Sequence, residues 1–111
     1  NGKIILFSDW AANSQPYKDY LPYLVAKGSI ETLTKALAVE LAPDVTVNCI
    51  APGPVLKPSD LTDDEDKEVA HGTLLKPWAG PEEIAKAVLY LLDADFVTGI
   101  ILPVDGGRSI V

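Results

Sequence analysis

The sequence predicts an α/β fold built on a parallel sheet, and two observations support this prediction. Short apolar segments alternate with segments of helical periodicity along the 111 residues, which is typical of parallel strands joined by right-handed helical crossovers. The strand segments are also apolar throughout, as expected where helices cover both faces of a sheet. The length suits one small domain with a core of its own.

The first strand is predicted over residues 3–8, and a loop that contains Asn13 follows over residues 9–22. Residues 23–41 show helical periodicity, and Pro43 ends the helix. The apolar stripe of this helix consists of Ile30, Leu33, Leu37 and Leu41, and the residues off the stripe are Glu31, Lys35 and Glu40. Such a stripe is typical of the side of a helix that faces a core.

A second strand is predicted over residues 45–50, and the run Ala51-Pro52-Gly53-Pro54 ends it. Thr62 and Glu65 have the spacing of a capping box, which predicts a short helix over about residues 63–70.

A further helix is predicted to begin at Pro81, because Pro is favoured at the first helical position and two glutamates follow in the first turn. Its inner side carries Ile84, Val88 and Leu91. The last strand is predicted over residues 96–104, and Asp105-Gly106-Gly107 closes it.

The predicted order is strand, helix, strand, short helix, helix, strand. Three parallel strands with nothing on one flank leave an open edge that needs covering. The sequence has no methionine and begins at Asn1. We therefore expect residues 1–111 to be part of a larger domain.

Composition excludes several functional classes. No apolar run approaches the roughly 20 residues that span a bilayer, and no secretory signal is visible. A net charge of −7 argues against binding of nucleic acid through its phosphates. The single Cys49 is expected to be a buried thiol, which fits a reducing compartment and a cytoplasmic protein. No residues have the spacing of metal ligands.

Loop segments leave the predicted carboxyl ends of the strands, where parallel sheets bind ligands. Ser8-Asp9-Trp10 follows the first strand, and Pro52–Val55 follows the second. Tyr23 and Lys27 share one helix face, and a lysine ammonium nearby lowers the pKa of a tyrosine from about 10. This pair alone is weak evidence of chemistry.

Five segments in this order resemble the C-terminal half of the short-chain dehydrogenase/reductase family. They are GKIILFS, the Y-x-x-x-K pair within YLVAKGSIETLTKALAVELAP, VTVNCIAPGPV, WAGPEEIAKAVLYLL and VTGIILPVDGG. Together they cover nearly the whole chain. The resemblance implies the C-terminal half of a Rossmann-type, doubly wound parallel sheet, with residues 1–111 as the C-terminal part of one reductase domain.

The resemblance also implies hydride transfer between a nicotinamide cofactor, NADPH or else NADH, and a small substrate. Tyr23 would then be the general acid/base, and Lys27 would bind the nicotinamide ribose and lower the pKa of Tyr23. The other residues that it places at the cofactor are Ser8, Pro52, Gly53 and Val55. Lack of a Cβ at Gly53 suits close approach of backbone.

One departure from the family pattern concerns the substrate. The family places a serine where this chain has Asp9, and an aspartate there resembles pteridine reductases, including bacterial dihydromonapterin and dihydrofolate reductases. A carboxylate suits an N-heterocycle, because it accepts hydrogen bonds from ring N–H and amino groups. Asp9 is therefore expected to be catalytic with Tyr23 and Lys27, and Trp10 and Pro54 to border the substrate. The spacing from Asp9 to Tyr23 is one residue longer than expected.

The family's glycine-rich phosphate loop does not occur in residues 1–111, so the N-terminal, dinucleotide-binding half is expected as a partner outside this chain. One alternative is a 3-oxoacyl or other carbonyl reductase that orients its substrate with Ser8. Another is a non-catalytic chain whose tyrosine helix packs against a second copy through Ile30, Leu33 and Leu37. Either way the resemblance implies a dimer or tetramer, and no membrane or nucleic-acid partner is expected.

Overall fold

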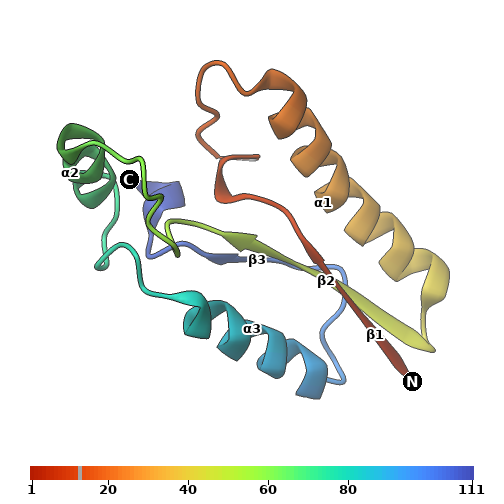
Figure 1. The fold of residues 1–111 in the computed structure, drawn as a ribbon. Coiled ribbons are helices and arrows are strands. Elements are labelled where there is room, and N and C mark those ends of the chain that lie inside the picture. The colour runs from red at the N-terminus through yellow and green to blue at the C-terminus, as the bar shows by residue number, and fades with distance from the viewer. Residues whose placement is uncertain (13) are drawn as a thin grey trace.

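The computed structural model describes residues 1–12 and 14–111. Its centre is a parallel sheet of β1 (Gly2–Phe7), β2 (Val45–Pro52) and β3 (Ile101–Val104). The strands lie in the order β1-β2-β3 (Figure 1). The predicted order of elements and the parallel pairing are confirmed, and the carboxyl ends of all three strands meet at one edge of the sheet.

Two helices cover opposite faces of this sheet. Figure 1 shows α1 (Leu21–Leu41) on one side and α3 (Pro81–Asp93) on the other. The short helix α2 (Asp63–His71) and two 3-10 turns, η1 (Trp10–Ala12) and η2 (Arg108–Ile110), lie near the carboxyl edge of the strands. The core is centred on β2, and its buried apolar side chains include Ala38, Val47, Cys49, Ile50 and Leu91.

Local signals explain where α2 and α3 begin. Thr62 Oγ1 accepts from the backbone N–H of Glu65 at 3.2 Å, and Glu65 Oε1 accepts from the N–H of Thr62 at 3.0 Å. The predicted capping box is therefore confirmed. The predicted start of α3 at Pro81 is also confirmed, and Leu91 faces the core as predicted.

The predicted inner face of α1 is right only in part, because Ile30, Leu37 and Leu41 are half-buried and Leu33 is exposed. The fully buried residues of this helix are Glu31, Thr34 and Ala38, whereas Leu33 lies 47% exposed. Because α1 carries leucine and valine on nearly every side, the spacing of its apolar residues does not identify the buried face. Small side chains let the helix approach the sheet closely, and Glu31 finds a hydrogen-bond partner there.

The predicted last strand is too long at its start, since β3 begins at Ile101 and not at residue 96. The side chain of Asn48 bonds to this segment beside the backbone: its Nδ2 donates to Val97 O at 2.9 Å, and its Oδ1 accepts from Ile100 N at 3.1 Å. Gly99 has a φ of 76°, which turns the chain out of an extended path.

The loop 9–22 is confirmed in outline, although η1 forms within it and α1 begins two residues before the predicted start. Asn13 lies outside the described residues. Within residues 1–12 and 14–111, no helix combines the length and the apolar character that crossing a bilayer requires.

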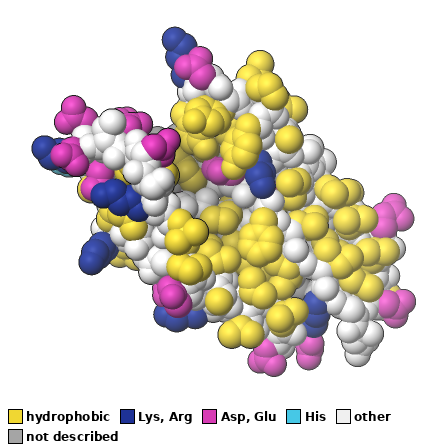
Figure 2. All heavy atoms as spheres, in the orientation of Figure 1, with side chains coloured by type: hydrophobic (Ala, Val, Ile, Leu, Met, Phe, Trp, Pro, Cys, Tyr) yellow, Lys and Arg dark blue, Asp and Glu magenta, His cyan; other side chains and the backbone are white. Residues whose placement is uncertain are grey.

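Hydrophobic side chains form a broad area on the face shown in Figure 2, between α1 and α3. Phe7 at the end of β1 and Leu92 of α3 are both exposed. In the described sheet β1 pairs with β2 alone, so its other edge is open, as predicted.

Candidate active site

Asp9 and Tyr23 form a hydrogen-bonded pair at the carboxyl end of β1. The Tyr23 hydroxyl donates to Asp9 Oδ2 at 2.8 Å, and the backbone N–H of Ala11 donates to Asp9 Oδ1 at 2.9 Å. The second bond is an Asx turn that begins η1 and orients the carboxylate. The chain therefore brings Asp9 to Tyr23 in spite of the additional residue between them.

The pKa of Tyr23 is shifted in the opposite direction to the one that we predicted. Partial burial, the hydrogen bond to Asp9 and the negative charge of that carboxylate raise the pKa of Tyr23 well above its ordinary value of 10. The net shift is therefore opposite to the lowering that we predicted from Lys27, and the effect of Lys27 itself stays a prediction. Asp9 touches the phenol oxygen, whereas the ammonium does not.

Lys27 lies against the ring of Tyr23. Its Nζ is 5.8 Å from the ring centroid, within the range of a cation–π contact, and it makes a long hydrogen bond of 3.4 Å to Phe7 O. Both contacts leave ammonium protons free to point toward a ligand. Tyr23 and Lys27 thus lie side by side as the sequence predicts.

Ser8 points away from this pair. It is 4% exposed, and its hydroxyl donates to Glu31 Oε2 at 2.7 Å. The single proton of that hydroxyl is therefore engaged inside the fold. Sequence reasoning missed Glu31, although its position four residues after Lys27 places it on the same helix face.

Aromatic rings continue from Tyr23 around the loop. Tyr20 meets Tyr23 edge-on at 6.2 Å and Tyr17 at 4.8 Å, and Tyr17 lies 6.3 Å from Trp10. The guanidinium of Arg108 covers the ring of Trp10 at 4.8 Å. One face of Trp10 is therefore occupied by a residue that no sequence motif identified.

The turn after β2 carries the other predicted cofactor residues. Gly53 N–H donates to Val104 O at 2.9 Å, which joins the turn to β3. A Cβ at Gly53 would lie 2.5 Å from the Cβ of Asp105. The absence of a side chain at Gly53 thus serves packing within the fold.

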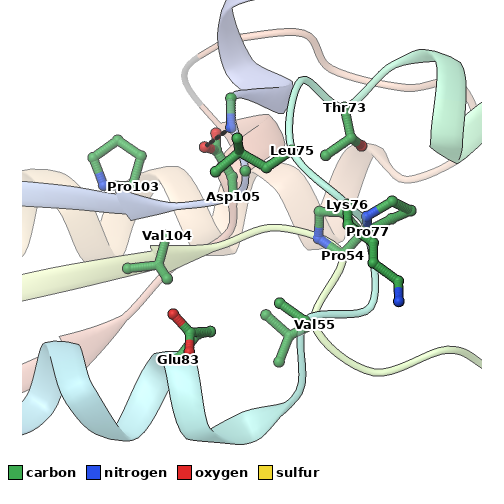
Figure 3. A pocket seen from close by; sticks show the side chains of 13 residues that line it. Pro54, Val55, Thr73, Leu75, Lys76, Pro77, Glu83, Pro103, Val104 and Asp105 are labelled. Atoms are coloured by element: carbon green, nitrogen blue, oxygen red, sulfur yellow. Dashed lines mark hydrogen bonds between the residues drawn. The ribbon is translucent and has the colours of Figure 1, made fainter.

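Pro54 and Val55 line a cavity of about 300 Å³. Figure 3 shows Val55 close to Val104 of β3 and Glu83 of α3. Among the described residues, its lining does not include the Asp9–Tyr23 pair. The structure therefore joins Asp9, Tyr23 and Lys27 directly and places Pro54 and Val55 at a neighbouring hollow of the same sheet edge.

The residues at this edge fit a nicotinamide nucleoside in one respect. Lys27 offers ammonium protons to hydroxyl groups beside Tyr23, and Pro52 ends β2 at the same edge. Lys27 would hold the ribose, and the turn Pro52–Val55 would border the ring.

A protein-family model described as enoyl-(acyl carrier protein) reductase matches residues 1–109. A dihydromonapterin reductase of Escherichia coli is 35% identical over 107 residues, which are 96% of this chain and 44% of that protein. A protein named as a ketoacyl reductase of the granaticin polyketide synthase of Streptomyces violaceoruber is 36% identical over 115 residues, covering 100% of this chain and 46% of its own length.

Among solved structures, a short-chain dehydrogenase/reductase of Brucella melitensis, described as a glucose/ribitol dehydrogenase, superposes with a TM-score of 0.88. It is 33% identical, and the match covers 98% of this chain and 46% of that one. The predicted Rossmann-type α/β arrangement is confirmed by this likeness. The chain spans about half the length of the curated relatives it matches.

Proposed function

The chain belongs to the short-chain dehydrogenase/reductase family, and from this premise we propose that it is the C-terminal part of an NADPH-dependent reductase that reduces a C=N bond of a pterin-like ring. NADH is the alternative cofactor. The rest of the Rossmann-type domain, with the dinucleotide-binding half, would cover the open edge of β1. The half-length match to relatives and that open edge support this division.

The observation that carries the substrate proposal is the hydrogen bond between Tyr23 and Asp9. A carboxylate beside the acid gives the site an acceptor for the N–H and amino groups of a nitrogen heterocycle. A carbonyl oxygen, which needs donors, would face a negative charge there.

The bound nicotinamide would supply hydride to the carbon of the C=N bond. Tyr23 would donate its hydroxyl proton to the nitrogen, so that C=N becomes CH–NH and the cofactor is oxidised. Asp9 would accept hydrogen bonds from the substrate, and this would partly neutralise the charge that raises the pKa of Tyr23. Tyr23 would thus be a stronger acid with substrate bound than without it, and Lys27 beside it would stabilise the phenolate.

A carbonyl reductase is the second candidate, and the ketoacyl reductase relative favours it. Its proposed donor, Ser8, is buried, and its hydroxyl donates a hydrogen bond to Glu31. The geometry of Ser8 therefore favours the pterin-like substrate over this alternative.

A non-catalytic role in oligomerisation is the third candidate. Leu33 and Val39 of α1 are exposed and suit a contact between copies, so we propose a dimer or tetramer for the enzyme as well.

The buried, free Cys49 fits a reducing compartment such as the cytoplasm. A full-length protein that binds no cofactor would favour the non-catalytic role in oligomerisation.

The test is an assay of the full-length protein that contains this chain, with NADPH or NADH and either dihydrobiopterin or a 3-oxoacyl thioester. We expect NADPH oxidation with the pterin, and its loss in Tyr23→Phe. Tyr20→Phe is the matched control, because it also removes one exposed hydroxyl and keeps the ring. Turnover of the thioester without turnover of the pterin would contradict the proposal.

A further inference from the structure

Three consecutive residues at the end of β1 are tied to three successive turns of α1. Phe7 O accepts from Lys27, Ser8 donates to Glu31, and Asp9 accepts from Tyr23. The three partners on α1 follow one another at intervals of four residues and so share one helix face. The strand end that carries Asp9 and the helix that carries Tyr23 thus meet along a single seam.

The Ser8–Glu31 contact is the buried member of this seam. Ser8 and Glu31 are 4% and 3% exposed, whereas the contacts of Tyr23 and Lys27 are exposed. Water competes less for buried hydrogen bonds than for exposed ones, and a bond to a buried carboxylate is strong. The buried bond therefore sets the distance between the strand end and the helix.

Packing alone does not hold Glu31 in place. Glu31 lines a second cavity of about 280 Å³, together with Trp10, Ala51 and other residues. A carboxylate beside such a space has room to take another rotamer. The bond to Ser8 helps to fix which rotamer Glu31 adopts.

From these observations we propose that Glu31 is a positioning residue, which acts through Ser8 to hold Asp9 within hydrogen-bond distance of Tyr23. This inference rests on the proposed function, in which the distance between Asp9 and Tyr23 matters for catalysis. Ser8 is buried and its hydroxyl is engaged by Glu31, so Ser8 would not contact substrate.

The test uses full-length protein with Ser8→Ala and Glu31→Leu, which each remove one side of the buried bond. Ser8→Thr keeps the hydroxyl donor and Glu31→Gln keeps an oxygen acceptor, so each of these variants should keep the buried bond. Thr34→Val is the matched control, because Thr34 is buried on the same helix and its hydroxyl donates to Ile30 O of its own helix.

We expect Ser8→Ala and Glu31→Leu to lower kcat by about tenfold to a hundredfold. The KM of Ser8→Ala should change by less than about twofold, because the buried Ser8 loses no substrate contact. A second readout needs no substrate: the titration of Tyr23, followed by NMR of its ¹³C-labelled Cζ. Separation from Asp9 should shift this titration toward lower pH in both variants.

Folded Ser8→Ala protein with a normal kcat and a normal Tyr23 titration would overturn the inference, as would equal effects in Thr34→Val. The two claims also fail separately. If no substrate is turned over but the titration of Tyr23 moves as expected, the proposed function is wrong and the positioning role stands. Should Glu31→Leu not fold, Ser8→Ala and its rescue by Ser8→Thr decide the question.

Discussion

The carboxylate of Asp9 has two opposed effects on Tyr23. It orients the hydroxyl through a bond of 2.8 Å, and it holds the proton on the phenol by raising its pKa. A tyrosine that keeps its proton is available as an acid over the whole neutral range, yet it releases the proton less readily. When a substrate donates hydrogen bonds to Asp9, the carboxylate should raise the pKa of Tyr23 less, and Tyr23 should release its proton more readily.

Asp9→Asn should lower the pKa of Tyr23, because the amide still accepts the hydrogen bond but carries no charge. The pKa should stay above 10, since partial burial also contributes. The measurement is the NMR titration of Tyr23 Cζ in labelled protein. Asp60→Asn, at an exposed loop position, is the control and should leave the titration unchanged.

The same interaction makes stability depend on alkaline pH. The pKa of Tyr23 is raised in the folded state, so its contribution is complete below the unfolded value of 10 and is lost progressively as the pH rises above it toward the folded value. We expect the free energy of unfolding in urea to fall above about pH 10. Tyr23→Phe should fall less steeply; identical slopes for the two proteins would contradict the assignment.

At the scale of elements, signals carried by a few neighbouring residues were predictable. Thr62 and Glu65 fix the start of α2 through bonds that close within four residues, and Pro81 does the same for α3. Signals that depend on distant partners were not predictable. The segment before β3 bonds to Asn48, about 50 residues earlier, and the buried Glu31 of α1 bonds to Ser8.

Gly53→Ala should destabilise the protein by about 1–3 kcal/mol, because the new methyl would press on backbone. Its Cβ would lie 2.5 Å from the Cβ and 2.6 Å from the Cα of Asp105. Gly28→Ala is the matched control: nothing lies within 4 Å of its Cβ, and alanine in a helix should stabilise by about 0.5–1 kcal/mol. Urea unfolding measures both, and a neutral Gly53→Ala would show that the turn relaxes.

Over the whole molecule, the parallel order of the strands follows from the sequence, because each crossover is visible as a helix between apolar runs. The meeting of Asp9, Tyr23 and Lys27 follows from it as well. The residues that contact the site do not follow from the sequence. Glu31 has the sequence pattern of a surface residue, yet it bonds to the buried Ser8, and Arg108, near the C-terminus, contacts Trp10. Such contacts depend on how the helices sit on the sheet, which local patterns do not specify.

The central claim is that Asp9, in contact with Tyr23, selects a nitrogen heterocycle over a carbonyl. The most direct test is the ratio of kcat/KM for dihydrobiopterin to that for a 3-oxoacyl thioester, in the full-length protein and in Asp9→Ser. The account predicts that the ratio falls by about tenfold to a hundredfold in Asp9→Ser, about what the loss of one charged hydrogen-bond partner produces, with carbonyl turnover kept or increased. An unchanged ratio, with both activities lowered alike or not at all, would contradict it.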